Sequence, residues 1–299
     1  MNKSKIIANN ADVFGNLEEV EVRNCNNLMK IFTSSMQRSL RSLRRLDISS
    51  CEMVEEVFEI QTSSVEEITQ DTVPSQLISL SLSRLRKLEY VWGKDPRGTL
   101  TFTHLEDVAV FDCPSLKSIF PLSIAKGLLK LRNLHLSHCG IQQIVEAVGT
   151  NAPVPPEFVF PQLQEMNLTH LENLVCFYPG LHTSSWPSLT SLIVEKCDKV
   201  KVLASELSSF QENHVLHYHD SSPIQQPLIF TKRRLHNIKR LEISHCEMVE
   251  EVFEIQMPKV EGTYNIIPSE SELIHLSLES LLKLKHVKWY KWYLKPNVE

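Results

Sequence analysis

Three histidines and an aspartate lie close together in one segment of the chain, HVLHYHD, at His214 to Asp220. Imidazole nitrogens and carboxylates are common ligands of zinc, copper and nickel, so His214, His217 and His219 are candidate ligands of a transition metal. The surrounding stretch is polar and has no strand or helix pattern that would fix their spacing. A solvated loop is therefore the favoured interpretation and metal binding the alternative, and no cofactor is expected.

A second string, GKDPRGTL, resembles the start of a phosphate-binding loop. Gly93 and Gly98 have the spacing of GxxxxGK[ST], but Thr99 stands where that loop needs its lysine. We interpret the string as a surface turn. The chain also lacks GxSxG and HExxH strings, so we expect no catalytic residues and no enzymatic activity.

A third candidate is KHVKWYKWYLK, at Lys285 to Lys295, which alternates basic and aromatic residues as single-stranded nucleic-acid binders do. The alternative is a cap in which the aromatic residues cover the last coil of a repeat structure. The net charge of −5 gives no overall attraction to nucleic acid or to anionic lipid. The cap is therefore favoured, and neither nucleic acid nor membrane is expected as a partner.

One string occurs twice in the chain, CEMVEEVFEIQ, at Cys51 to Gln61 and at Cys246 to Gln256. A shared structural role would preserve its buried apolar residues, but its solvated glutamates would drift apart. The identity therefore indicates an internal duplication and prompts a search for weaker copies.

Nine segments share the frame LxxLxLxx, with most steps in or near the 20–29 residues of leucine-rich repeats. The segments begin at Leu17, Leu43, Leu77, Leu105, Leu131, Leu163, Leu189, Ile238 and Leu273. Apolar residues at the fourth and sixth positions predict a short strand with one buried face. One unit cannot bury that face alone, so the units must stack. The expected fold class is α/β: a leucine-rich-repeat solenoid with a curved parallel sheet on its concave face and short helices, turns and loops on its convex face.

The units recur in threes. Units at Leu17, Leu105 and Leu189 follow an aromatic residue three positions earlier, the next unit in each triplet has a cysteine at position nine, and the third lacks it. We expect residues 1–16 to be a leader, residues 17–299 to form one repeat domain, and a loop to be inserted near 204–234. The leader has few large apolar residues, so we expect the first unit to pack against a preceding domain.

Six of the seven cysteines lie at the ninth position of a unit. No signal-peptide core and no apolar run long enough to span a bilayer is present in the sequence, so a cytoplasmic and reducing location is expected. We expect six buried, free thiols: Cys25, Cys51, Cys113, Cys139, Cys197 and Cys246.

The extended motif LxxLxVxxCxxLxxIF stands in this chain as LEEVEVRNCNNLMKIF from Leu17 and LEDVAVFDCPSLKSIF from Leu105. It resembles the leucine-rich-repeat region of plant intracellular nucleotide-binding resistance proteins of the coiled-coil branch. The resemblance implies a sensor that recognises a pathogen effector or a host protein in defence and contacts a nucleotide-binding domain of the same receptor family. The alternative is a substrate adaptor of a ubiquitin ligase.

The third, fifth and seventh residues of each unit are predicted to point outward from the concave face. Across the nine units these positions carry eight acidic residues and three arginines, which would repel nucleic acid. Two apolar residues, Phe111 and Ile193, stand among them and are candidate anchors for a protein. The candidate binding residues are Glu21, Arg23, Asp47, Phe111, His135, Asn167, Ile193, Glu195 and Glu242.

Overall fold

The structure is a computed structural model of the chain. It describes residues 16–33, 36, 40–59, 73–93, 95–96, 100–146, 155–206, 227–231, 237–254, 265–268, 273–285, 287 and 292–295. The residues His214, His217 and His219 and most of the insertion expected near 204–234 lie outside these ranges.

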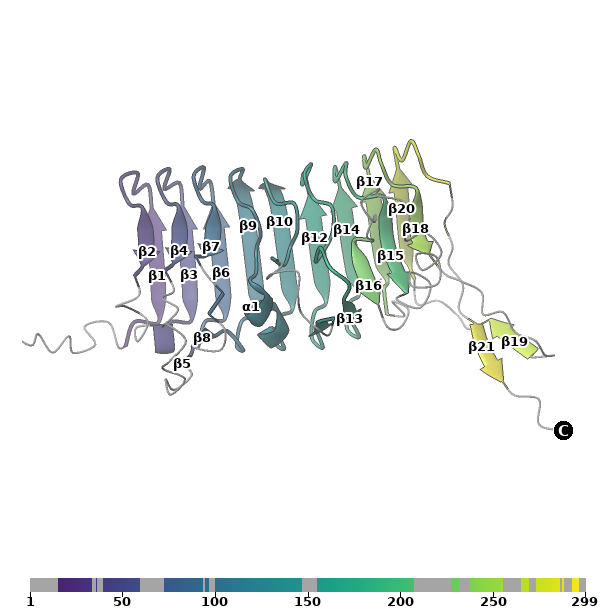
Figure 1. Cartoon of the computed structure of the whole chain (residues 1–299), viewed down its shortest axis with the longest axis horizontal. Coiled ribbons are helices and arrows are strands. Elements are labelled where there is room, and N and C mark those ends of the chain that lie inside the picture. Colours follow the sequence, from purple (N-terminus) through teal and green to yellow (C-terminus); the bar gives the residue numbers. More distant parts are fainter. Residues whose placement is uncertain are drawn as a thin grey trace, which may run out of the picture.

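Nine strands, one from each repeat, form a single sheet that runs the length of the solenoid (Figure 1). Every neighbouring pair is parallel, in the order β1-β3-β6-β9-β10-β12-β14-β17-β20. The predicted leucine-rich-repeat solenoid is thereby confirmed. The strands are β1 Glu19–Arg23, β3 Arg45–Ser49, β6 Ser79–Ser83, β9 Asp107–Cys113, β10 Asn133–Cys139, β12 Glu165–Thr169, β14 Ser191–Glu195, β17 Arg240–Ser244 and β20 His275–Glu279.

Each strand follows the predicted alternation. In β3, for example, Leu46 and Ile48 are buried, whereas Arg45 is exposed and Asp47 is partly exposed. The inward leucines, isoleucines and valines of successive strands lie next to one another and form one continuous core. The outward side chains form the surface that we call the strand face.

The residue after the seventh position turns the chain out of each strand. This eighth residue has a left-handed backbone, with φ between 51° and 57°, in all nine repeats. In most repeats its amide donates to the seventh-position carbonyl of the next repeat, as Arg84 N does to Phe111 O at 2.9 Å and His170 N to Glu195 O at 2.8 Å. The turn thus extends the ladder by one hydrogen bond and directs the ninth residue inward. The eighth residues are Asn24, Ser50, Arg84, Asp112, His138, His170, Lys196, His245 and Ser280.

The inward ninth residue explains the cysteines. Each thiol lies near the seventh-position carbonyl of its own repeat, as in Cys51 Sγ to Ser49 O at 3.3 Å and Cys246 Sγ to Ser244 O at 3.3 Å. A small, weak donor fits this buried corner beside the backbone. All seven cysteines are free.

The prediction of six buried thiols is right for five of them and wrong for Cys25, which is exposed. Cys25 lies in the repeat of β1, an edge strand of the sheet, and no described repeat covers the outer side of this repeat. Cys176, outside the repeat position, is also buried, and burial raises the pKa of its thiol to about 12.

We predict that this difference is visible in solution. In native protein one thiol, Cys25, should react rapidly with a disulfide reagent such as DTNB, and the buried ones should react slowly. Unfolding without reductant should reveal all seven. Cys25→Ser should remove the fast reaction alone; two or more fast thiols in the native chain, or fewer than seven after unfolding, would contradict the assignment.

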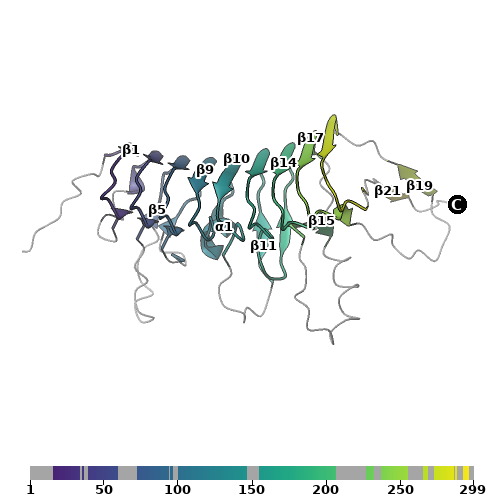
Figure 2. The same cartoon turned by 90° about the horizontal axis from the view of Figure 1, so that it is seen from above.

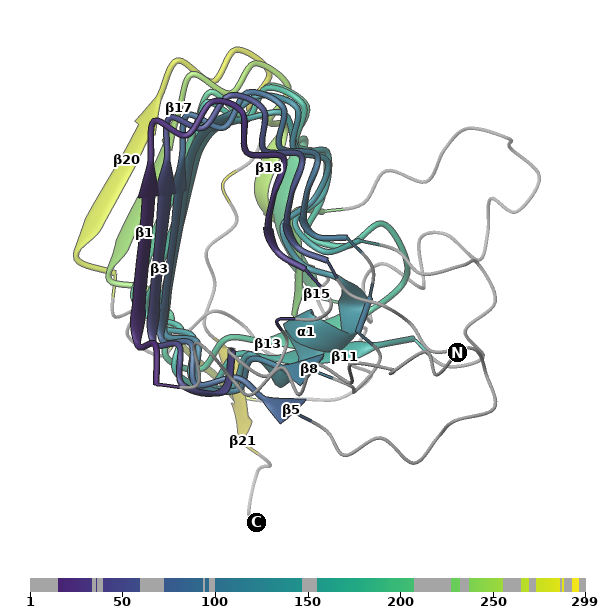
Figure 3. The same cartoon turned by 90° about the vertical axis from the view of Figure 1, so that its left-hand side faces the viewer.

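The side opposite the sheet differs in part from expectation. Short parallel strands, which were not expected beside the helices, turns and loops, line much of it (Figures 2 and 3). The segments KIF, EVF and YVW are rich in β-branched and aromatic residues, which favour strands. They form the sheet β2 Lys30–Phe32, β4 Glu56–Phe58 and β7 Tyr90–Trp92.

Further short elements complete this side. The helix α1, Leu122–Gly127, is a short helix of the kind expected on the convex face and buries Ile124 and Ala125. The small sheets pair β5 Val73–Pro74 with β8 Leu100–Thr101, and β11 Glu157–Val159 with β13 Thr183–Ser185. A third joins β15 Val202–Glu206 to β16 Ile229–Thr231 and β18 Glu251–Glu254.

The segment expected to be a cap pairs elsewhere. Strand β21, Trp292–Lys295, pairs antiparallel with β19, Asn265–Pro268, and neither strand joins the nine-stranded sheet. Ile274 and Leu282 of the β20 repeat remain 82% exposed. Among the described residues, no helix has the length and apolar character needed to cross a membrane.

Candidate protein-binding surface

The candidate residues lie on two parallel rows of the strand face. The fifth positions of all nine repeats are in register across the sheet, from Glu21 on β1 through Asp47 on β3 to Ser277 on β20. Six candidates belong to this row: Glu21, Asp47, His135, Asn167, Ile193 and Glu242. Three belong to the seventh-position row: Arg23, Phe111 and Glu195. Neighbouring strands are about 4.8 Å apart, so residues several strands apart in a row are far from one another. The candidates therefore divide into two groups, one on β1, β3 and β9 and one on β10 to β17.

The first group surrounds Arg23. Its guanidinium Nε lies 2.5 Å from Glu21, and its Nη2 donates to Asp47 at 3.2 Å. All three side chains are substantially exposed, so the pairs contribute little to stability. Their main effect is to hold Arg23 against its own strand and to balance its charge.

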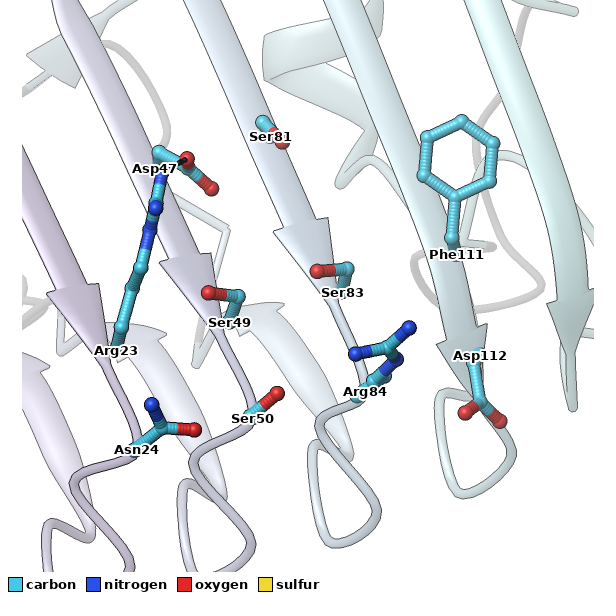
Figure 4. A pocket seen from close by; sticks show the side chains of 10 residues that line it. All are labelled: Arg23, Asn24, Asp47, Ser49, Ser50, Ser81, Ser83, Arg84, Phe111 and Asp112. Atoms are coloured by element: carbon cyan, nitrogen blue, oxygen red, sulfur yellow. Dashed lines mark hydrogen bonds and ion pairs between the residues drawn. The ribbon is translucent and has the colours of Figure 1, made fainter.

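A hollow of about 670 Å³ opens beside this group (Figure 4). Small side chains form its floor, Ser49 on β3 and Ser81 and Ser83 on β6, between Arg23 on one side and Phe111 on the other. Small floor residues let a ligand approach the sheet, and each hydroxyl can both donate and accept hydrogen bonds. Phe111 is 40% exposed and supplies an apolar wall.

Four residues of the hollow were missed by sequence reasoning. They are eighth-position residues, which the left-handed turn places along the rim: Asn24, Ser50, Arg84 and Asp112. The signal was present in every repeat, because a polar residue always stands between the outward seventh and the inward ninth position. Since the residue types differ, no motif marks them.

Of the two arginines that line the hollow, Arg84 has fewer ion-pair partners. Its side chain is exposed and forms no ion pair with the described residues, whereas Arg23 is held by two carboxylates. A guanidinium with open donors can bind a carboxylate in a fork geometry. The hollow therefore combines an available cation, a serine floor and an aromatic wall.

The second group lies farther along the sheet. His135 Nε2 is 3.8 Å from Glu165, and Glu242 contacts both Arg240 at 2.8 Å and His275 at 2.9 Å. Ile193 lies between Asn167 and Glu242 in register. It is partly buried, and so less exposed than its outward position in the sequence pattern suggests. The structure does not bring this group together with the hollow.

The eighth-position row continues past this second group. The rings of His138 and His170 stack with centroids 4.1 Å apart, and Lys196 Nζ lies 3.1 Å from His170 Nε2. Burial is the largest cause that lowers the pKa of His170, and electrostatic repulsion from His138 and Lys196 lowers it further. His170 therefore stays neutral in neutral solution and can accept a hydrogen bond from Lys196.

Among the residues that the structure describes, no three His, Cys, Asp or Glu side chains come together as metal ligands. Gly93, in the string that resembles a phosphate loop, follows strand β7, and a Cβ there would clash with the Glu56 carboxylate. The Glu56 carboxylate lies against Gly93 and would repel a phosphate bound at this glycine. The surface turn remains the better interpretation of that string.

The chain matches a protein-family model. The model of the family described as plant disease resistance protein RPS2-like, leucine-rich repeats, matches residues 2–140 and 208–295. Neither the curated proteins nor the solved structures give a match. The matched ranges hold most of the chain, with both copies of the duplicated string and the strands of the hollow. The chain therefore belongs to the family of RPS2-like leucine-rich repeats of plant disease resistance proteins.

Proposed function

We propose that the strand face binds a protein ligand and that the chain is the sensor part of a plant immune receptor. The ligand is a pathogen effector or a modified host protein, and the chain meets it in the cytoplasm without catalysing a reaction. A nucleotide-binding domain of the same receptor family is the second partner. The hollow of Figure 4 is the observation that carries this proposal.

Three properties of the strand face support a protein ligand. It is built on strands rather than loops, so its side chains are held in fixed positions. It is predominantly acidic, which disfavours nucleic acid. Phe111, at 40% exposure beside polar residues, has the character of an interface anchor.

We predict that Phe111→Glu strongly weakens binding of a ligand that uses this surface. The substitution removes the apolar contact and places a carboxylate beside Asp112, so affinity should fall by about thirtyfold or more. Secreted pathogen proteins and host proteins would be screened against the immobilised chain, and each binder titrated against wild type and variant by biolayer interferometry.

Val175 offers a matched control on the opposite side. Its side chain is 39% exposed, nearly the same fraction as that of Phe111. Its amide donates to the carbonyl of Gln142, in a segment away from the strand face. Val175→Glu should leave affinity within about twofold of wild type. Binders that tolerate Phe111→Glu and lose affinity with Val175→Glu would move the recognition surface to the other side and overturn the proposal.

A further inference from the structure

The two edge strands of the large sheet belong to repeats of complementary kinds. β1 lies in a repeat of the aromatic-led kind, like β9 and β14, and β20 lies in a cysteine-free repeat, like β6 and β12. Within the sheet, a cysteine-free repeat is followed by an aromatic-led one at β6–β9 and at β12–β14. The free edge of β20 is therefore the edge of a cysteine-free repeat, and in both internal examples an aromatic-led repeat covers such an edge.

Both edges expose side chains that these internal junctions bury. Leu276 on β20 is 45% exposed, while its equivalents Leu80 and Met166 are buried. On β1, Val20 is partly exposed, while its equivalent Val108 is buried. The same holds for Val22, Cys25 and Leu28, whose equivalents in the β9 repeat are Val110, Cys113 and Leu116.

The backbone groups that join such repeats are also open at the edges. At the β6–β9 junction the amide of Glu106 donates to Ile78 O at 2.8 Å, and the amide of Arg84 donates to Phe111 O at 2.9 Å. The equivalent groups at the edges are the amide of Glu18, the carbonyl of Ile274 and the amide of Ser280. None of these three groups has a hydrogen-bond partner among the described residues. Open parallel edges of this kind are templates for another strand.

Applying the internal register to β20 and to β1 of another copy gives a charge-matched pair. Inside the chain, the third and seventh residues of β6 lie opposite those of β9. The same register places His275 opposite Glu19 and Glu279 opposite Arg23, with Leu276 opposite Val20 between them. At the seventh position Glu279 and Arg23 face each other with opposite charge, at the third position the His275 imidazole faces the Glu19 carboxylate and can donate a hydrogen bond to it, and apolar residues meet on the inward side.

We propose that the edge of β20 in one copy of the chain stacks on the edge of β1 in a second copy, continuing the sheet across the two molecules. The contact is heterologous, since it joins two different surfaces, so each dimer still presents one free edge of each kind. Association then grows step by step with concentration rather than stopping at a closed dimer.

Sedimentation equilibrium of the 299-residue chain tests this directly. The weight-average mass should rise above the monomer mass of 34.4 kDa with increasing concentration and pass the dimer mass without a plateau. Leu276→Lys should reduce the association constant by about tenfold or more, because it places an ammonium group in the apolar centre of the contact. Leu129→Lys is the matched control: Leu129 is 46% exposed, between α1 and β10, and its replacement should leave association unchanged.

A charge exchange makes the test specific for this register. Arg23→Glu and Glu279→Arg should each associate weakly alone, because like charges then face each other at the seventh position. An equimolar mixture should recover association, since in mixed contacts the two substituted residues face each other, as do the two unsubstituted ones, and both of these pairings join opposite charges. Circular dichroism would establish that the variants fold. A monomer at all concentrations, a closed dimer, or mixtures that stay as weak as the single variants would overturn the proposal.

Discussion

Phe58→Ala should lower the free energy of unfolding by about 3–5 kcal/mol, the range for deleting a buried phenylalanine side chain. Phe58 is fully buried on β4 and contacts three rings, which belong to the repeats on either side of its own. Its centroid lies 5.5 Å from that of Phe32, 5.8 Å from Trp92 and 5.4 Å from Phe102. In a solenoid each repeat is stabilised chiefly by its neighbours, so one truncation here weakens several interfaces at once.

Urea unfolding followed by tryptophan fluorescence measures this effect, because Trp92 lies in the same cluster as Phe58. The control is Phe111→Ala, which removes the same side chain from the exposed strand face and should change stability by about 0.5 kcal/mol or less. Equal losses from the two substitutions would show that the aromatic cluster does not join the repeats.

The nine strands and their inward residues were predictable because the information is local. Each repeat carries its own LxxLxLx pattern, and a period of two fixes which side chains face the core. Val110 and Phe111 illustrate this rule, because they are adjacent in sequence. Val110 is buried, whereas Phe111 is exposed and forms the aromatic wall of the hollow. The two rows of candidate residues follow from the same rule.

Other features depend on neighbours that the sequence does not place. Cys25 has the same repeat position as Cys113, and only the absence of a described repeat beyond β1 separates the exposed thiol from the buried one. The hollow exists because serines of β3 and β6 happen to lie side by side once the register is set. Arg84 lines the hollow because a left-handed turn places it there, and residues of many types adopt this turn in the chain. No sequence motif therefore marks Arg84 as a residue of the hollow.

Stability should also fall as the pH decreases from about 6.5 towards 4, because of one buried histidine. His182 is fully buried among the rings of Phe158, Phe177 and Tyr178, and its Nδ1 donates to Gly180 O at 2.9 Å. Burial lowers the pKa of His182 from 6.5 to about 4. Tyr178 is the titratable neighbour in contact, and burial raises its pKa, so it stays neutral across this range.

The sign follows from proton binding in the two states. Between about pH 4 and 6.5 the unfolded chain holds a proton on His182 that the folded chain does not, so acid favours unfolding. Relative to neutral pH, this group should cost about 2 kcal/mol at pH 5. Measuring unfolding free energies at both pH values for wild type and His182→Phe isolates the contribution, because phenylalanine fills a similar volume and cannot titrate. The variant should lose about 2 kcal/mol less than wild type between the two pH values; parallel losses would mean that His182 is protonated as easily in the fold as in water.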